Sequence, residues 1–479
     1  GRRYAFDQHQ VHETLYEGLN ELLREHYHGA LAEVLAAAPG SDAARAVDLL
    51  THALRGARRD LADDVLLPAL TQLAKTHQNA RAADLAERAL TLPGFLDGER
   101  RADVLVRLAE RCEILGRRAR QLAATEEAER LAVAARATTL AARAARLHAV
   151  ALTVTSRVPE AQAALERAAR HAESAGDAAL RATIAVHLGV LLQNLAQPDA
   201  ARAQLLAARD LAESLGELRT VASADINLAS TLALLGELDD AERRVRAGLD
   251  RVRELDDPHG ECNASGILGG VSWAMGRFDD AAEAFTRQLE LARELGDRDA
   301  ESYATGNLGT LHWMRGRPDL ARPHYERQLE LGRETGNRVG QALATGNLGS
   351  ILLAEGRVDD ARTWHERHLA LSRAIGYRQG EVLALINLAL VAFEVGDTAR
   401  GEAFATEALT LADRFGDAVG RTESRLVLGA HRARTGDAPG ARAHLTAARD
   451  LADVGNQASG RVLARCHLAT LPGGDADDA

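Results

Sequence analysis

The sequence predicts an all-α protein, a right-handed superhelical solenoid built from stacked helical hairpins. Its composition is helical, because only 3% of the 479 residues are aromatic, only ten are proline, and β-branched runs of strand length are scarce. The same apolar pattern also returns every forty residues. Glycines close each apolar segment, where a helix would end.

The forty-residue period is visible as columns of identical residues. One column holds the leucines Leu188, Leu228, Leu268, Leu308, Leu348, Leu388, Leu428 and Leu468. Glycine can enter the left-handed conformation at a helix C-terminus without strain, so two glycine columns predict two helix ends per unit. The first contains Gly236, Gly276, Gly316, Gly356, Gly396 and Gly436, and the second, interrupted by Asp256, contains Gly176, Gly216, Gly296, Gly336, Gly376 and Gly416.

The unit is therefore a hairpin of two helices. An aspartate column three residues after the first set of glycines, exemplified by Asp319, is expected to cap the second helix. One hairpin cannot bury its apolar faces alone, so neighbouring hairpins must stack into an array.

Four segments are expected along the chain. Residues 1–40 form a separate N-terminal helical segment, and residues 41–157 form degenerate helix pairs without strict spacing. Residues 158–470 form the regular forty-residue array with a C-terminal capping helix. Residues 471–479 are expected to be disordered, because Gly and Asp leave little that could dock.

The stretch ATGNLG occurs at 304–309 and again at 344–349 and superficially resembles a phosphate-binding loop. Such a loop ends in Gly-Lys-Ser/Thr between a strand and a helix, whereas Lys75 is the only lysine in the chain. Both copies fall in the middle of a predicted first helix. We interpret Gly309 and Gly349 as positions where a neighbouring helix approaches closely.

Charge and composition exclude several functional classes. A net charge of −11 without a basic stripe argues against nucleic-acid binding. No membrane-spanning apolar run or signal peptide is found, which predicts a cytoplasmic protein with no membrane partner. The three cysteines are too scattered for a disulfide framework or a zinc site. An Arg- and Ala-rich, Lys-poor composition is compatible with a bacterial source.

No catalytic, cofactor or metal site is predicted. His9, His12 and Glu13, with His26 and His28 nearby, depart from the HExxH zinc spacing. No G-x-S-x-G nucleophile motif occurs. The chain is therefore not expected to be an enzyme.

The repeat pattern resembles tetratricopeptide repeats (TPR) of the forty-residue Pins/LGN-like type. The resemblance is carried by Leu-Gly, Gly-Arg-x-Asp-x-Ala, Leu-x-Leu, the GDR and GNR at 296–298 and 336–338, and HERHLALSRAIGYRQGE at 365–381. It covers residues 158–470 and extends less closely over 43–157. Residues 4–36 are similar to the segment that joins an NTPase module to helical repeats in bacterial STAND-type regulators. This likeness, and a start without Met, imply the C-terminal arm of a larger signalling protein with an upstream NTPase module in the same polypeptide.

The candidate binding site is the column immediately before the leucines, which contains Asn227, Asn307, Asn347 and Asn387. The resemblance implies that this column lines a concave groove and that its asparagines hydrogen-bond a bound peptide backbone. An amide suits that role, because it both donates and accepts. The aromatic residues expected on the same face are Tyr303, Trp273, Trp313 and Phe393.

The predicted function is a protein-interaction array that binds a protein or peptide ligand, as the sensor or regulatory arm of a STAND-type regulator. Two alternatives remain, an intramolecular scaffold that holds an attached effector module inactive and a small-molecule sensor. A purely structural role for the asparagines, bridging successive helices, also remains open.

Overall fold

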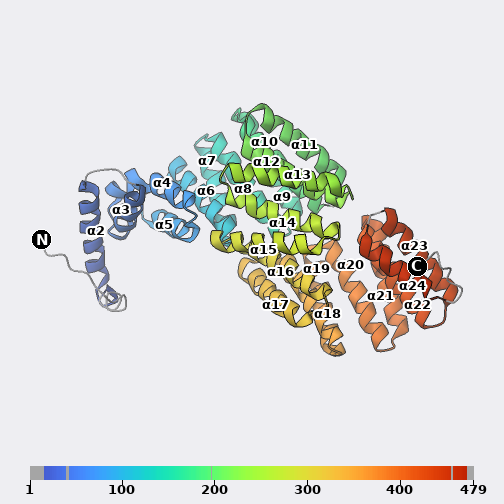
Figure 1. Cartoon of the computed structure of the whole chain (residues 1–479). Coiled ribbons are helices and arrows are strands. Elements are labelled where there is room, and N and C mark those ends of the chain that lie inside the picture. Colours follow the sequence, from blue (N-terminus) through green and yellow to red (C-terminus); the bar gives the residue numbers. More distant parts are fainter. Residues whose placement is uncertain (1–15, 39–42, 196, 455–456, 472–479) are drawn as a thin grey trace. The chain divides into compact units, whose positions relative to one another are not determined.

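The computed structural model describes residues 16–38, 43–195, 197–454 and 457–471. Across these residues all regular secondary structure is α-helical, and the predicted all-α solenoid of helical hairpins is confirmed (Figure 1). The chain divides into two compact units, residues 1–147 and 148–479.

The first unit contains six complete helices of the described chain and most of a seventh. The long core side chains Leu66, Leu70 and Leu105 are buried between them. The helices are α2 (Glu21–Ala37), α3 (Ala43–Arg55), α4 (Arg59–Lys75), α5 (Asn79–Thr91), α6 (Gly98–Ile114), α7 (Arg118–Ala134) and α8 (Thr138–Val154), which crosses the unit boundary.

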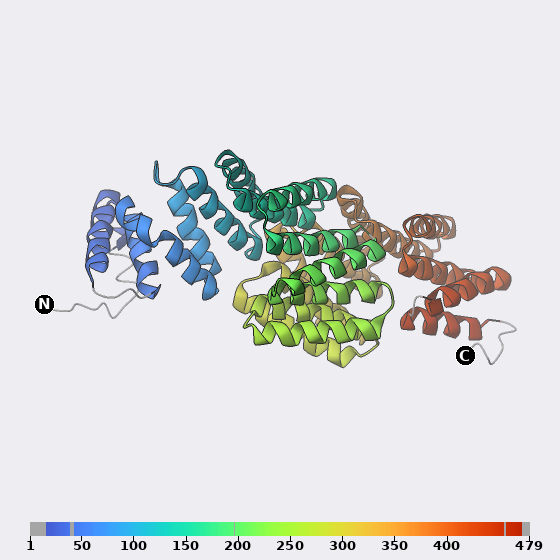
Figure 2. The ribbon, with the colours of Figure 1, turned by 90° about the horizontal axis from the view of Figure 1, so that it is seen from above.

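The second unit continues as antiparallel hairpins in which each first helix packs against the second helix that follows it (Figure 2). The first helices are α10 (Ala178–Asn194), α12 (Leu218–Leu234), α14 (Pro258–Ala274), α16 (Arg298–Met314), α18 (Arg338–Ala354), α20 (Arg378–Glu394), α22 (Ala418–Arg434) and α24 (Ala458–Ala469). The second helices are α9 (Val158–Ser174), α11 (Pro198–Ser214), α13 (Leu238–Glu254), α15 (Phe278–Leu295), α17 (Pro318–Thr335), α19 (Val358–Ile375), α21 (Thr398–Phe415) and α23 (Ala438–Val454).

The helix spacing is more regular than the sequence analysis expected. From α6 at Gly98 to α24 at Ala458, a new helix begins every twenty residues, so the strict spacing expected only after residue 157 already holds from residue 98. The glycines of both predicted columns have positive φ, between 67° and 85°. Non-glycine residues take the same left-handed conformation at Ala57, His77, Arg136, Ser156 and Asp256.

Helix capping differs from the prediction for the aspartate column. Asp319 lies inside the first turn of α17, where it pairs with Arg317, and the N-cap residue Arg317 makes no side-chain cap. Its carboxylate still meets the positive helix end. The capping aspartates instead precede the first helices, as in Asp297, whose Oδ1 accepts from the Ala300 amide at 3.0 Å.

The two ATGNLG copies lie in the middle of α16 and α18, and their glycines are contact points. A Cβ on Gly309 would lie 2.9 Å from Cε1 of Tyr325, and one on Gly349 would lie 2.8 Å from Cε1 of His365. The close helix approach predicted at these glycines is confirmed.

The leucine column belongs to the core but not uniformly. Leu348 and Leu388 are buried, whereas Leu308 is half-buried. At the C-terminus Leu471, the first residue of the predicted disordered tail, packs into the last core cluster, and residues 472–479 lie outside the described residues. Within the described chain no helix combines the length and apolarity needed to cross a membrane.

Candidate functional site

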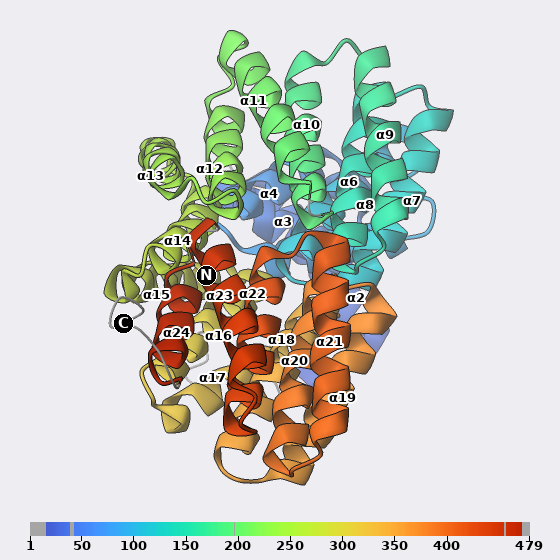
Figure 3. The same ribbon diagram turned by 90° about the vertical axis from the view of Figure 1, so that its right-hand side faces the viewer.

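The first helices of the hairpins form the inner layer of the second unit. Each first helix from α10 to α22 packs against the next first helix, while no pair of successive second helices packs to a comparable extent. Figure 3 shows α16, α18 and α20 side by side. An array whose inner helices lie closer together than its outer helices curves toward the inner layer. We call the exposed side of these first helices the inner face.

The predicted asparagine column lies on four of these first helices. Asn227 belongs to α12, and Asn307, Asn347 and Asn387 belong to α16, α18 and α20, with all four side chains half-buried. Helices related by exact twenty-residue spacing carry equivalent positions on equivalent faces. The structure therefore places the four amides at corresponding points of their repeats.

The hydrogen bonding separates Asn227 from the other three. Its Nδ2 donates to the Ser223 carbonyl oxygen at 2.8 Å, within the same helix. Among the described residues, the side-chain amides of Asn307, Asn347 and Asn387 have no protein hydrogen-bond partner. The bridging role left open by the sequence is therefore not seen at these three positions, and their donors and acceptors remain available to a ligand.

The predicted aromatic residues divide between the face and the core. Tyr303 is 40% exposed, and its hydroxyl accepts a hydrogen bond from Asn337 Nδ2 at 3.3 Å. Trp273 and Trp313 are half-buried against the cores of their own repeats. Phe393 is a correction to the expected face, because it is only 6% exposed.

The burial of Phe393 has a local cause in the neighbouring helices. Its ring stacks on His431 of α22 with a centroid distance of 3.7 Å. It also fills the space above Gly401 of α21, where an added Cβ would lie within 2.2 Å of a ring carbon. Phe393 therefore contributes to packing and offers no ring to a ligand.

Three apolar residues on the inner face were missed by the sequence reasoning. Leu343 and Leu383 are half-buried and Leu390 is 39% exposed. They lie four residues before or three residues after Asn347 or Asn387, which places them on the same side of their helices. That spacing was a sequence signal that could have found them.

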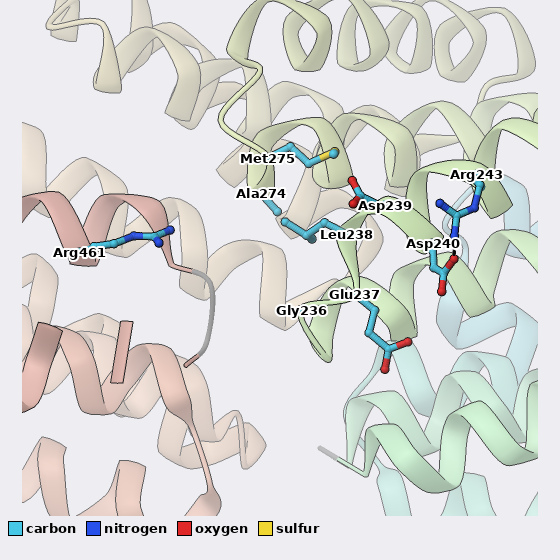
Figure 4. Close-up of a pocket in the computed structure, with 9 residues that line it drawn as sticks. All are labelled: Gly236, Glu237, Leu238, Asp239, Asp240, Arg243, Ala274, Met275 and Arg461. Carbon is cyan, nitrogen blue, oxygen red and sulfur yellow. Dashed lines mark ion pairs between the residues drawn. The ribbon is translucent and has the colours of Figure 1, made fainter. Parts of the chain in front are cut away.

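A separate pocket of about 580 Å³ lies where the α12–α13 turn and the end of α14 face α24 (Figure 4). Most of its charged groups are already engaged, since Glu237 pairs with Arg202 at 2.9 Å and Asp240 pairs with Arg243, whereas Asp239 makes no ion pair among the described residues. Arg461 likewise pairs with Asp453 at 3.6 Å. Small-molecule sites need several polar groups free to converge on a ligand, and this pocket includes none of the predicted site residues.

The histidine group considered in the sequence divides between described and undescribed residues. His9, His12 and Glu13 lie outside the described residues. His28 forms one hydrogen bond from Nε2 to the Tyr16 hydroxyl and one from Nδ1 to Nδ1 of His52, each at 2.7 Å. Over the described ranges no three His, Cys, Asp or Glu side chains are grouped to hold a metal ion.

The geometry defines a class, a helical-hairpin repeat protein whose first helices present a continuous inner face. Comparison with protein families then identifies the repeat. The tetratricopeptide repeat model matches three overlapping stretches, residues 261–334, 299–374 and 339–414. Residues 261–414 thus form a tetratricopeptide repeat array, as the sequence predicted.

Solved structures share the fold at low sequence identity. A Rap protein complexed with competence and sporulation factor matches with a TM-score of 0.53 and 13% identity, covering 74% of this chain and 98% of that one. The apo quorum sensor NprR from B. thuringiensis matches with a TM-score of 0.50 and 12% identity, covering 74% and 99%. A STAND protein with a tetratricopeptide repeat sensor from Pyrococcus horikoshii has a TM-score of 0.45 and 14% identity, covering 89% and 68%. No curated protein matches the chain.

Proposed function

We propose that this chain is a protein-interaction array that binds an extended segment of a peptide or protein partner along the inner face of α16, α18 and α20. The observation that carries the proposal is the row of three half-exposed amides, Asn307, Asn347 and Asn387, none with a protein partner among the described residues. An unpaired amide at equivalent points of successive repeats can pair with main-chain groups regardless of the ligand's side chains.

Two similar folds support a binding role without defining it. The Rap protein was solved as a complex with competence and sporulation factor, and NprR is a quorum sensor. Each is similar to this chain only in fold. They favour a ligand-responsive array over an enzyme.

The wider role that we propose is the sensor or regulatory arm of a STAND-type signalling protein. Its support is the sequence of residues 4–36, which resembles the junction between an NTPase module and helical repeats. The alternative is a scaffold that holds an attached module inactive, in which case the inner face would be occupied by the same polypeptide. A small-molecule sensor is the weaker alternative, because most charged groups of the pocket in Figure 4 are already paired.

The test replaces both Asn307 and Asn347 by Leu in the intact chain. The probes are peptides of roughly twelve residues selected from a displayed random library, a length that in extended form spans several repeats. Loss of two amide pairings should weaken binding by about 1 kcal/mol for each lost hydrogen bond. The melting temperature should change little, because the amides make no protein hydrogen bond.

The matched control is Asn227→Leu, the same substitution in the same column where the amide is already bonded to Ser223. We expect it to leave peptide affinity unchanged. A double variant that melts earlier while its folded fraction binds peptide as tightly as the parent would show that the amides serve stability, contrary to the proposal.

A further inference from the structure

The inner face has an unusual composition, since it carries no formal charge over a long distance. Asp, Glu, Lys and Arg are absent from four consecutive first-helix stretches. These stretches are residues 262–274, 302–314, 339–354 and 382–393.

Charged residues are instead concentrated on the second helices and at the helix ends, where they pair with one another. Glu301, at the start of α16, is 7% exposed in its side chain and lies 3.0 Å from Arg298 and 3.5 Å from Arg327 of α17. Arg373 of α19 similarly pairs with Glu381 at 2.7 Å. Glu394, directly after the last charge-free stretch, is exposed at the end of α20 and makes no ion pair among the described residues, so the one free charge at this edge is an anion.

The hydroxyls beside the asparagines are also committed to their own helices. Thr310 Oγ1 donates to the Gly306 carbonyl at 3.0 Å, and Ser350 Oγ donates to the Gly346 carbonyl at 3.2 Å. Besides the exposed Asn263 of α14, which stands at the position of Leu343 and Leu383, the amides of the asparagine column are therefore the main hydrogen-bond donors left on the middle of the face. Apolar groups surround them at Leu343, Leu383 and Leu390.

A ligand side chain with a full charge would lose water on this face without gaining a countercharge, which is costly. An apolar side chain would instead be transferred favourably onto the leucines. We infer that the inner face selects an extended peptide segment whose central side chains are uncharged and mostly apolar. This inference rests on the proposed function, because it specifies the ligand of that same face.

The repeat geometry also sets the register of the ligand. Contacting helices have axes about 8–10 Å apart, and an extended chain advances about 3.3 Å per residue. Successive asparagines should therefore meet the ligand main chain about every three residues. The charge-free part of α14, α16, α18 and α20 would accept about nine residues.

The experiment uses the displayed library of random peptides selected on the intact chain, followed by synthesis of the selected peptides. Affinity is measured by fluorescence polarisation for each peptide and for a version with one central residue replaced by Asp. We expect the selected centres to be uncharged and the Asp versions to bind at least about tenfold more weakly.

A charge added to the protein gives a second, independent readout. Leu390→Lys places a cation at an exposed position of the face, and it is combined with Glu394→Gln because Glu394 lies one helical turn further along α20 and would otherwise pair with the new lysine. This variant should restore binding of a peptide that carries Asp opposite position 390. Its matched control is Glu326→Lys, at an exposed position of the second helix α17, which should restore nothing.

The outcomes separate the two claims. Selected peptides that lose affinity with the Asn307→Leu and Asn347→Leu pair but carry charged centres would overturn the inference and leave the proposed function standing. Peptides indifferent to that pair, or no selected peptides at all, would overturn the proposed function and the inference with it. Uncharged centres together with rescue by Leu390→Lys support both.

Discussion

At the scale of single residues, two histidines of α19 occupy positions that are apolar or neutral in the neighbouring repeats. His365 and His368 are 0% and 2% exposed, and within the described structure neither ring has a hydrogen-bond partner. They pack on Gly349 and Gly346, as Phe285 and Gln288 of α15 pack on the corresponding glycines of α14. Burial lowers the pKa of each histidine from 6.5 to about 4.

These pKa shifts predict a loss of stability in mild acid. Because the folded pKa lies below the unfolded value, the unfolded chain binds more protons between about pH 6.5 and 4, and stability falls as pH decreases through that window. Between pH 7 and 5 the free energy of unfolding should fall by about 2 kcal/mol for each histidine. The folded repeat should be unaffected above pH 7.

The comparison variant is His365→Phe with His368→Gln, which copies α15. Denaturant unfolding followed by tryptophan fluorescence is suited to the measurement, since Trp364 adjoins His365. We expect the parent chain to lose more stability than the variant between pH 7 and 5. Other buried histidines, such as His28 and His431, titrate in both proteins and cancel. Equal pH dependence in the two proteins would show that protonation of this pair does not act on folding.

The candidate site shows what residue identity could and could not predict. The asparagine column was found from the forty-residue period alone, because residues at the same position of successive first helices lie on the same face of those helices. Phe393 was misplaced, because its exposure depends on Gly401 and His431 of two other helices. Nothing in the sequence of α20 by itself indicates the space beside Gly401 that the Phe393 ring fills.

At the scale of elements, helix pairing depends on small residues of the first helix fitting large residues of the second. Gly269 and Gly270 of α14 provide an adjacent test. A Cβ on Gly269 would lie 2.5 Å from Cε1 of Phe285, whereas a Cβ on Gly270 would meet nothing within 4 Å. We expect Gly269→Ala to destabilise by about 1–3 kcal/mol through overpacking. Gly270→Ala should stabilise by up to about 1 kcal/mol through helix propensity.

Both substitutions add one methyl group to the same helix turn, so each is the control for the other. Thermal or denaturant unfolding of the intact chain measures the difference. If the two alanines had equal effects, the glycine would not be setting the approach of α15.

The element spacing also explains why the N-terminal repeats looked degenerate in sequence. Helix ends at Arg136 and Ser156 take φ of 60°, the conformation that Gly takes in the later repeats. A non-glycine residue there costs free energy but keeps the turn. The glycine signal was therefore absent from the sequence, although the twenty-residue spacing of the helices was kept. The sequence predicted helix pairs in this region but not their exact spacing.

At the scale of the whole molecule, a solenoid gains stability from contacts between neighbouring repeats. Helices of the second unit pack mainly with the helices next to them in sequence and with the next first helix. Among the described residues no helices of distant repeats pack extensively on each other, and the approach of α24 to the α12–α13 turn and the end of α14 is limited to the rim of the pocket in Figure 4. The number of repeats should consequently be adjustable, provided that the register is kept.

We therefore predict that deletion of residues 338–377 leaves a folded protein. The deletion removes α18, α19 and the following turn, and joins Asn337 to Arg378 at the start of α20. The cap should survive, because Gly380 then stands where Gly340 now donates to Asn337 Oδ1 at 2.9 Å. A first helix again follows α17, so the inner layer continues.

The matched control deletes residues 338–357, half of the period, and places second helix α19 after second helix α17. Their charged outer faces cannot replace the apolar first helix, so this protein should lose helical signal per residue and cooperative unfolding. Far-UV circular dichroism and thermal unfolding of both deletions decide the matter, and equal damage by the two would mean that stability does not reside in the forty-residue unit.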